Sequence, residues 1–278
     1  MKIQIMQIFK ESFKHVWSHM LEWLRVAFAP IIIFCSGLFV LFMFSIAGGV
    51  VSSGLTTNNI PAEGLTPGGY FLLGLGILVF SVTFVVGIVN LAINGLRYGV
   101  LSEGGKRWWT LRLDWRFWKL LVYYLLISVL TVIYALIAVG IVMGAESLFN
   151  SVVLNVILGT LFALFGIYLM IRIGLTFLLI AIDQKKPLRR SWHLLKSNIL
   201  RFFWLVFFVS ITITIITMIG SVLLSLLGML LGYVNTSLGD AVSIPSFLWS
   251  VFIWFINWAV ISKATAGVYK TFTEGTVF

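Results

Sequence analysis

The chain has 278 residues, of which 60% are hydrophobic and only 10% are charged, and its formal net charge is +10. A soluble domain is roughly half apolar and a quarter charged, so this composition excludes a soluble globular protein. The apolar residues come in long runs, and about 20 of them in succession form a helix that crosses a bilayer. The sequence therefore predicts an all-α polytopic membrane protein.

Residues 1–25 are predicted to form an amphipathic helix that lies in the headgroup plane before the chain turns inward at Pro30. Its apolar residues recur at three- and four-residue steps: Met6, Phe9, Phe13, Val16, Met20 and Leu24. Glu11, His15 and His19 are four residues apart, which is acceptable metal-ligand spacing. The two histidines need at least one more strong ligand, so no metal site is predicted.

Six membrane spans are predicted within a single membrane domain that covers residues 1–278. The runs are continuously apolar, whereas the strands of a membrane barrel alternate, so helices are expected. The gaps between the runs are too short for a separate catalytic domain. The predicted spans are 27–51, 70–96, 120–142, 152–182, 202–231 and 247–268.

The distribution of cations predicts the orientation of these spans. Gaps 52–69, 143–151 and 232–246 contain no Lys or Arg, so all 19 basic residues lie on the other side or at helix ends that adjoin it. Because Lys and Arg resist translocation, that side is predicted to be cytoplasmic, together with both termini. A basic face attracts anionic lipids, at about 1 kcal/mol per cation. Nucleic acid is not an expected partner, because the cations form no separate basic domain.

Short internal similarities predict three hairpin-like repeats. Ser12–Val26 aligns without gaps with Ser191–Leu205, and "YGVLSEG" at 98–104 parallels "YKTFTEG" at 269–275. Each unit would begin with an amphipathic basic segment, followed by a span outward, a cation-free loop and a span back. Trp prefers the interface and long cations reach the headgroups, so six cations are predicted to be interfacial anchors. These are Arg189, Arg190, Lys196, Arg201, Arg116 and Lys119.

The stretch "AIDQKKPLRRSWHLLKSNILRFFWL" carries a family resemblance through Asp183, Ser191, Leu194 and Asn198. It resembles the membrane domain attached to some bacterial glycerophosphodiester phosphodiesterases, and equally the free-standing, six-helix YciC-like inner-membrane proteins. This resemblance implies a helical protein of the bacterial inner membrane, in a family whose members mostly lack an assigned activity. The phosphodiesterase barrel and its catalytic residues are absent from this chain, so the resemblance implies no enzymatic activity.

Polar side chains inside the predicted spans are the candidate site residues. Charged groups in lipid are costly, so such residues usually face a partner or a cavity. A cation-lined pocket for a lipid phosphate is one interpretation, while helix packing and cations that reach out to the headgroups are the alternatives. The residues are Arg172, Lys263, Asn90, Asn94 and Arg97.

Two classes of function follow from these patterns. The first is a non-catalytic inner-membrane protein that binds or organises anionic lipid or a membrane partner complex, with a homo-oligomer also open. The second is a transporter or flippase for a lipid or another amphiphilic anion. The sequence has no HExxH, Walker or GxSxG motif and no paired carboxylates within its spans, so neither an enzyme nor a cofactor is expected.

Overall fold

The computed structural model describes residues 4–47, 67–149, 151–234 and 242–273, and within these ranges the regular structure is entirely helical. Six helical segments of this part are long and apolar enough to cross a membrane, which indicates a multi-pass membrane protein. The helices are α1 (Ile5–Ser18), α2 (Met20–Ala47), α4 (Pro67–Leu101), α5 (Trp115–Phe149), α6 (Val152–Ile173), α7 (Thr176–Ala181), α8 (Pro187–Leu195), α9 (Ile199–Val234) and α11 (Ser243–Thr273).

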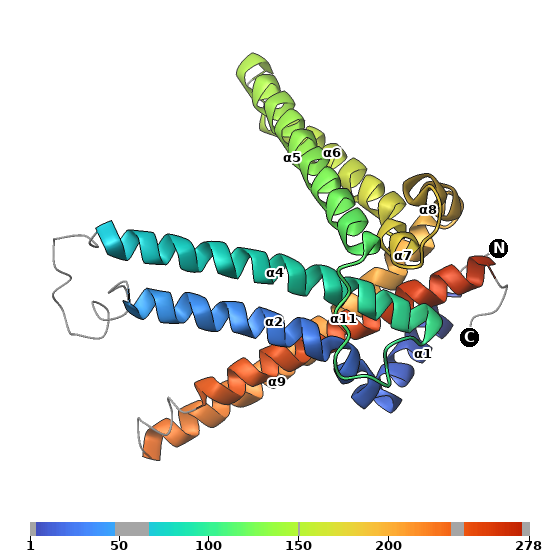
Figure 1. Ribbon diagram of the computed structural model, residues 1–278. Helices are drawn as coiled ribbons and strands as arrows, with labels where there is room; N and C mark the ends of the chain where they lie inside the picture. Colours follow the sequence, from blue (N-terminus) through green and yellow to red (C-terminus); the bar gives the residue numbers. More distant parts are fainter. Residues whose placement is uncertain (1–3, 48–66, 150, 235–241, 274–278) are drawn as a thin grey trace.

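The long helices pair as three hairpins, α2 with α4, α5 with α6, and α9 with α11. The hairpins spread apart at one end and converge at the other (Figure 1). The short helices α1, α7 and α8 and the segment 102–114 lie where the hairpins converge, and this region is here called the basal end. The fold is therefore a splayed set of hairpins joined at one end.

Small residues bring α2 and α4 close together along their length. A Cβ atom added to Gly37 would lie only 1.8 Å from Thr83 Oγ1, and one on Gly87 would lie 3.1 Å from the carbonyl oxygen of Pro30. Glycines in membrane helices allow backbones to approach in this way, and dispersion contacts then hold the pair together. These small residues of α2 and α4 are thus used for helix packing.

The packed core lies at the basal end. Trp23 of α2, Leu178 and Leu179 of α7, Leu195 of α8 and Val260 of α11 belong to one cluster of buried side chains. By contrast, the most apolar stretches of α5 and α6 contain no buried residue. In a membrane such side chains face lipid tails that are as apolar as they are, so the spread hairpins expose nothing unfavourable.

The N-terminal region differs from its prediction. The helix expected over residues 1–25 ends at Ser18, a turn follows at His19, and α2 then continues through Pro30 without a break. The turn allows α1 to fold back onto α9 and α11, where it buries Ile8, Ser12 and Val16. Of the predicted apolar stripe, Val16 is buried and Phe9, Phe13 and Met20 pack against the core, whereas Met6 and Leu24 are exposed.

The fourth span also differs, because it is interrupted between α6 and α7. Helix α6 ends at Ile173, and Gly174 donates its N–H to the carbonyl of Ile171 at 3.0 Å. A Cβ at Gly174 would lie 2.9 Å from the ring of Phe202, so a glycine at this turn lets α9 approach closely. After the turn, α7 packs against α4, α5 and α8.

Candidate functional site

The basal end carries the basic residues of the described part of the chain. Every Lys and Arg of the described residues lies in α1, α8, the segments 102–114 and 182–198, or the parts of the long helices that adjoin them. The opposite helix ends in the described part have none. This asymmetry makes the basal end the candidate site for any anionic ligand.

Arg97 of α4 is buried in this region and is fully engaged with the protein. Its guanidinium donates to Glu103 Oε2 from two nitrogens, at 3.0 and 2.5 Å, and to the carbonyl of Ala181 at 2.8 Å. These hydrogen bonds lower the pKa of Glu103, with further contributions from the charges of Arg97 and Arg112. Arg97 therefore joins α4 to the segment 102–114 and to the end of α7.

Asn90 and Asn94 lie on the same face of α4 and hold the rest of that segment. Asn94 Nδ2 donates to the carbonyl of Thr110 at 2.7 Å, and Asn90 Oδ1 accepts the backbone N–H of Arg112 at 2.6 Å. Both side chains are buried. The three polar residues of the second span thus do come together, but their partners are the chain's own backbone and side chains.

Arg172 joins α6 to α8. It donates to the hydroxyl of Tyr168 at 2.8 and 3.2 Å and to the carbonyl of Trp192 at 2.9 Å. Its guanidinium also lies 4.6 Å from the Trp192 ring and 5.2 Å from the Tyr168 ring. In the reverse direction, Ser191 Oγ donates to the carbonyl of Arg172 at 2.8 Å. Arg172 is only 7% exposed.

Lys263 lies elsewhere, on the face of α11 that packs against α4 and α1. Its Nζ is 3.4 Å from the carbonyl of Gly99, and the side chain is buried. Lys263 and Arg172 thus bond to different parts of the protein, Lys263 to Gly99 of α4 and Arg172 to Tyr168 of α6 and Trp192 of α8.

His15 of α1 packs against Trp23 of α2 and against His19, which lies in the turn between the two helices. The rings of His15 and His19 stack at 4.5 Å, and Trp23 Nε1 donates to His15 Nδ1 at 3.5 Å. Burial, together with the charge of Lys263, lowers the pKa of His15 to about 4, so this ring is neutral at pH 7. In the part of the chain that the structure describes, no group of three or more acidic, His or Cys side chains is arranged to hold a metal ion.

The predicted interfacial anchors are mostly accessible. Arg189, Arg190 and Lys196 are exposed, whereas Arg201 and Lys119 are partly buried. Arg116 pairs with Asp183 and Asp114, and Arg190 donates to Gln184. Exposed indoles accompany these cations at the basal end: Trp108, Trp109, Trp115, Trp118 and Trp192.

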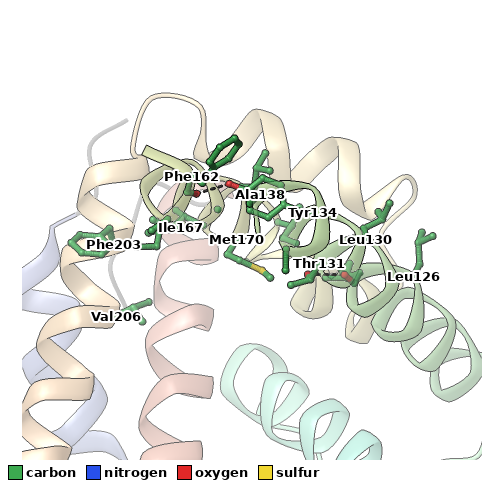
Figure 2. A pocket seen from close by; sticks show the side chains of 18 of the residues that line it. Leu126, Leu130, Thr131, Tyr134, Ala138, Phe162, Ile167, Met170, Phe203 and Val206 are labelled. Atoms are coloured by element: carbon green, nitrogen blue, oxygen red, sulfur yellow. Dashed lines mark hydrogen bonds between the residues drawn. The ribbon is translucent and has the colours of Figure 1, made fainter. Parts of the chain in front are cut away.

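A large cavity that the sequence did not reveal opens between the hairpins. It has a volume of about 1190 Å³ and lies between α5 and α6 on one side and α9 and α11 on the other. Figure 2 shows Leu130 and Tyr134 of α5 on one side of this space and Phe203 and Val206 of α9 on the other. The cavity depends on the angle between helices that are far apart in sequence, and no local sequence pattern predicts that angle.

Comparisons of the chain with protein-family models, with curated proteins and with solved structures find no match.

Proposed function

We propose that the protein is a non-catalytic component of the bacterial inner membrane that binds anionic lipid at its basal end. The observation that carries this proposal is the group of exposed cations on and just after α8, namely Arg189, Arg190 and Lys196, beside the exposed ring of Trp192. Cations attract phosphate, and indoles favour the headgroup region. The family resemblance around residues 181–205 agrees with an inner-membrane location.

The buried cations have a different role in this proposal. The hydrogen bonds of Arg97 and Arg172 are directed to groups of the protein itself. A lipid phosphate at either guanidinium would have to displace these partners. The headgroup contacts are therefore assigned to the exposed cations, and Arg97 and Arg172 to positioning the helices that carry them.

Lipid binding is tested by replacing Arg189, Arg190 and Lys196 together with glutamine. Three cations near a charged surface contribute roughly 3 kcal/mol, so the preference for phosphatidylglycerol over phosphatidylethanolamine should fall by up to about 100-fold. Native mass spectrometry of lipid adducts measures this preference. Replacing the exposed Lys10 and Lys14 of α1 is the matched control, with a smaller expected loss. An unchanged preference in the triple variant would contradict the proposal.

The proposed orientation places the basal end and both termini in the cytoplasm, since Lys and Arg resist translocation. In a Cys35→Ser background, cysteines introduced at Thr57, Ser147 and Thr236 should react with an impermeant thiol reagent added to intact cells. Thr57 and Thr236 lie outside the residues that the structure describes. Cysteines at Ser102 and Ser197, both at the basal end, should react only after the membrane is opened. Labelling of a cysteine at position 102 in intact cells would contradict the proposed orientation and indicate the opposite one.

A lipid transporter or flippase is the second candidate function. The cavity between the hairpins favours it, because transporters hold their substrates between bundles of helices. Proteoliposomes that contain a fluorescent lipid distinguish the two candidates. A transporter exposes the inner-leaflet probe to a membrane-impermeant quencher, whereas a binding protein leaves it protected.

A further inference from the structure

The cavity between the hairpins is lined almost entirely by hydrocarbon. Apart from Tyr123, the lining residues that bear a hydroxyl are Thr131, Tyr134 and Thr265. Each of these hydroxyls donates to a carbonyl of the protein, namely those of Ile127, Phe162 and Ile261. These hydroxyl protons are therefore already used within the protein. A polar solute or a chain of water molecules would find few hydrogen-bond partners here.

Small residues give the cavity its depth. Gly159, Ala163 and Gly166 of α6 and Ala135 and Ala138 of α5 form part of the lining. A Cβ atom at Gly166 would lie 3.1 Å from the ring of Tyr134, so α5 and α6 are already in contact there. At Gly159, by contrast, nothing lies within 4 Å of an added Cβ. The space beside Gly159 is therefore open to an occupant.

The basal end of the cavity reaches α8, the helix that carries the exposed cations Arg189 and Arg190. Leu188 lines the cavity, and Trp192, one turn further along α8, lies on the same face of the helix. Ile171 and Ile173 also line it, on either side of the Arg172 that contacts Trp192. Arg189 and Arg190, the next two residues of α8, are exposed on other faces of the same helix. The apolar space thus ends at the helix that carries these positive charges.

We propose that this cavity holds the acyl chains of an anionic phospholipid whose headgroup lies against α8. The site rests on the proposed function for its headgroup contacts, but its chain contacts are independent of that function. The volume of about 1190 Å³ exceeds the roughly 300–1,000 Å³ of typical small-molecule pockets, which leaves room for extended chains. Apolar walls with cations at one end complement a molecule that is apolar with an anion at one end.

The test uses the full-length protein in nanodiscs of phosphatidylglycerol that contain a trace of the same lipid with a photoreactive acyl chain. Crosslinks should concentrate on the cavity lining, such as Leu130 and Ile167, and should be at least fivefold fewer on outward residues such as Leu125. Gly159→Phe places a ring in the open space and should reduce the crosslinks to the lining at least fivefold. Gly140→Phe is the matched control, because an added Cβ also meets nothing there, and Gly140 does not line the cavity.

Melting curves and gel filtration confirm that both glycine variants fold, and Gly159→Leu provides a smaller filler if the phenylalanine variant does not. Equal crosslinking of lining and outward residues, or crosslinking unaffected by filling the cavity, would overturn the proposal. The proposal would also fail if native mass spectrometry showed a dimer that Gly159→Phe dissociates, because a second copy of the chain would then fill the cavity. If the α8 triple variant loses its anionic preference while the chain crosslinks persist, both proposals stand. If phosphatidylethanolamine crosslinks to the cavity lining as strongly as phosphatidylglycerol, and the wild-type protein shows no preference for anionic lipid, only the headgroup assignment fails.

Discussion

Replacing Arg97 with glutamine is expected to lower the thermal midpoint of the purified protein by about 5–10 °C. The guanidinium is 7% exposed and holds Glu103 and the carbonyl of Ala181 together. Glutamine cannot reach both, and hydrogen bonds to charged groups contribute about 1.5–3 kcal/mol each. Because Glu103 is partly exposed, water can replace some of what it loses, so a net cost of about 2–3 kcal/mol is expected.

The pH dependence of this loss separates the two contacts of Arg97. The pKa of Glu103 lies below its ordinary value of 4.5 in the folded protein, so its pairing stabilises the fold above that pH and is lost as the pH falls through the folded pKa. The difference between the wild-type and Arg97→Gln midpoints should therefore be largest near pH 7 and shrink below pH 4.5. A residual difference should remain, because the contact with Ala181 does not titrate. A difference independent of pH would show that the ion pair contributes nothing.

Much of the membrane architecture can be predicted from composition and hydrophobic length. Runs such as 70–96 and 202–231 correspond to α4 and α9, because a helix satisfies its own backbone in lipid and a span needs a minimum apolar length. Both helices extend three to five residues beyond the predicted spans at each end, from 70–96 to Pro67–Leu101 and from 202–231 to Ile199–Val234. Hydrophobicity therefore indicates where a span lies more reliably than where its helix ends.

The breaks at His19 and Gly174 were not predicted, because both depend on tertiary contacts. Pro30 carries the stronger local signal for a break, yet α2 continues through it and packs there against Gly87. The turn at His19 follows instead from the packing of α1 on α9 and α11. At Gly174 the helix stops where the ring of Phe202 approaches. The sequence pattern contains these residues, but not the distant partners that give them their role.

The candidate site shows the same limit. The cost of polar groups in lipid predicts that Arg97, Asn94 and Arg172 need partners, and in the structure each forms hydrogen bonds within the protein. Which partners they meet depends on the segment 102–114 and on α8, whose sequences show no sign of that contact. The cavity could not be predicted from the sequence at all, because it results from the angle between the hairpins. Residue types thus predict a requirement, and only the fold shows how it is met.

Replacing Arg172 with glutamine is expected to lower the thermal midpoint about as much as Arg97→Gln does, without weakening the binding of anionic lipid. The guanidinium holds the Tyr168 hydroxyl and the Trp192 carbonyl and stacks on both rings, so its loss should cost about 3 kcal/mol and separate α8 from α6. The thermal midpoint of Arg172→Lys should lie between those of the wild type and Arg172→Gln, because an ammonium keeps the charge but cannot make the planar contacts of a guanidinium. Melting curves measured beside native mass spectra should show a lower midpoint with the anionic-lipid adducts of the remaining folded protein retained.

Arg189→Gln provides the matched control for this change, because it removes the same charge from an exposed position on α8. It should leave the midpoint within about 1 °C, since surface substitutions rarely change stability by more than about 0.5 kcal/mol, and it should weaken the anionic adducts. The two variants thus have opposite expected readouts. If Arg172→Gln kept its midpoint and lost the adducts, the buried guanidinium would bind the headgroup, and the cations of α8 would only surround it.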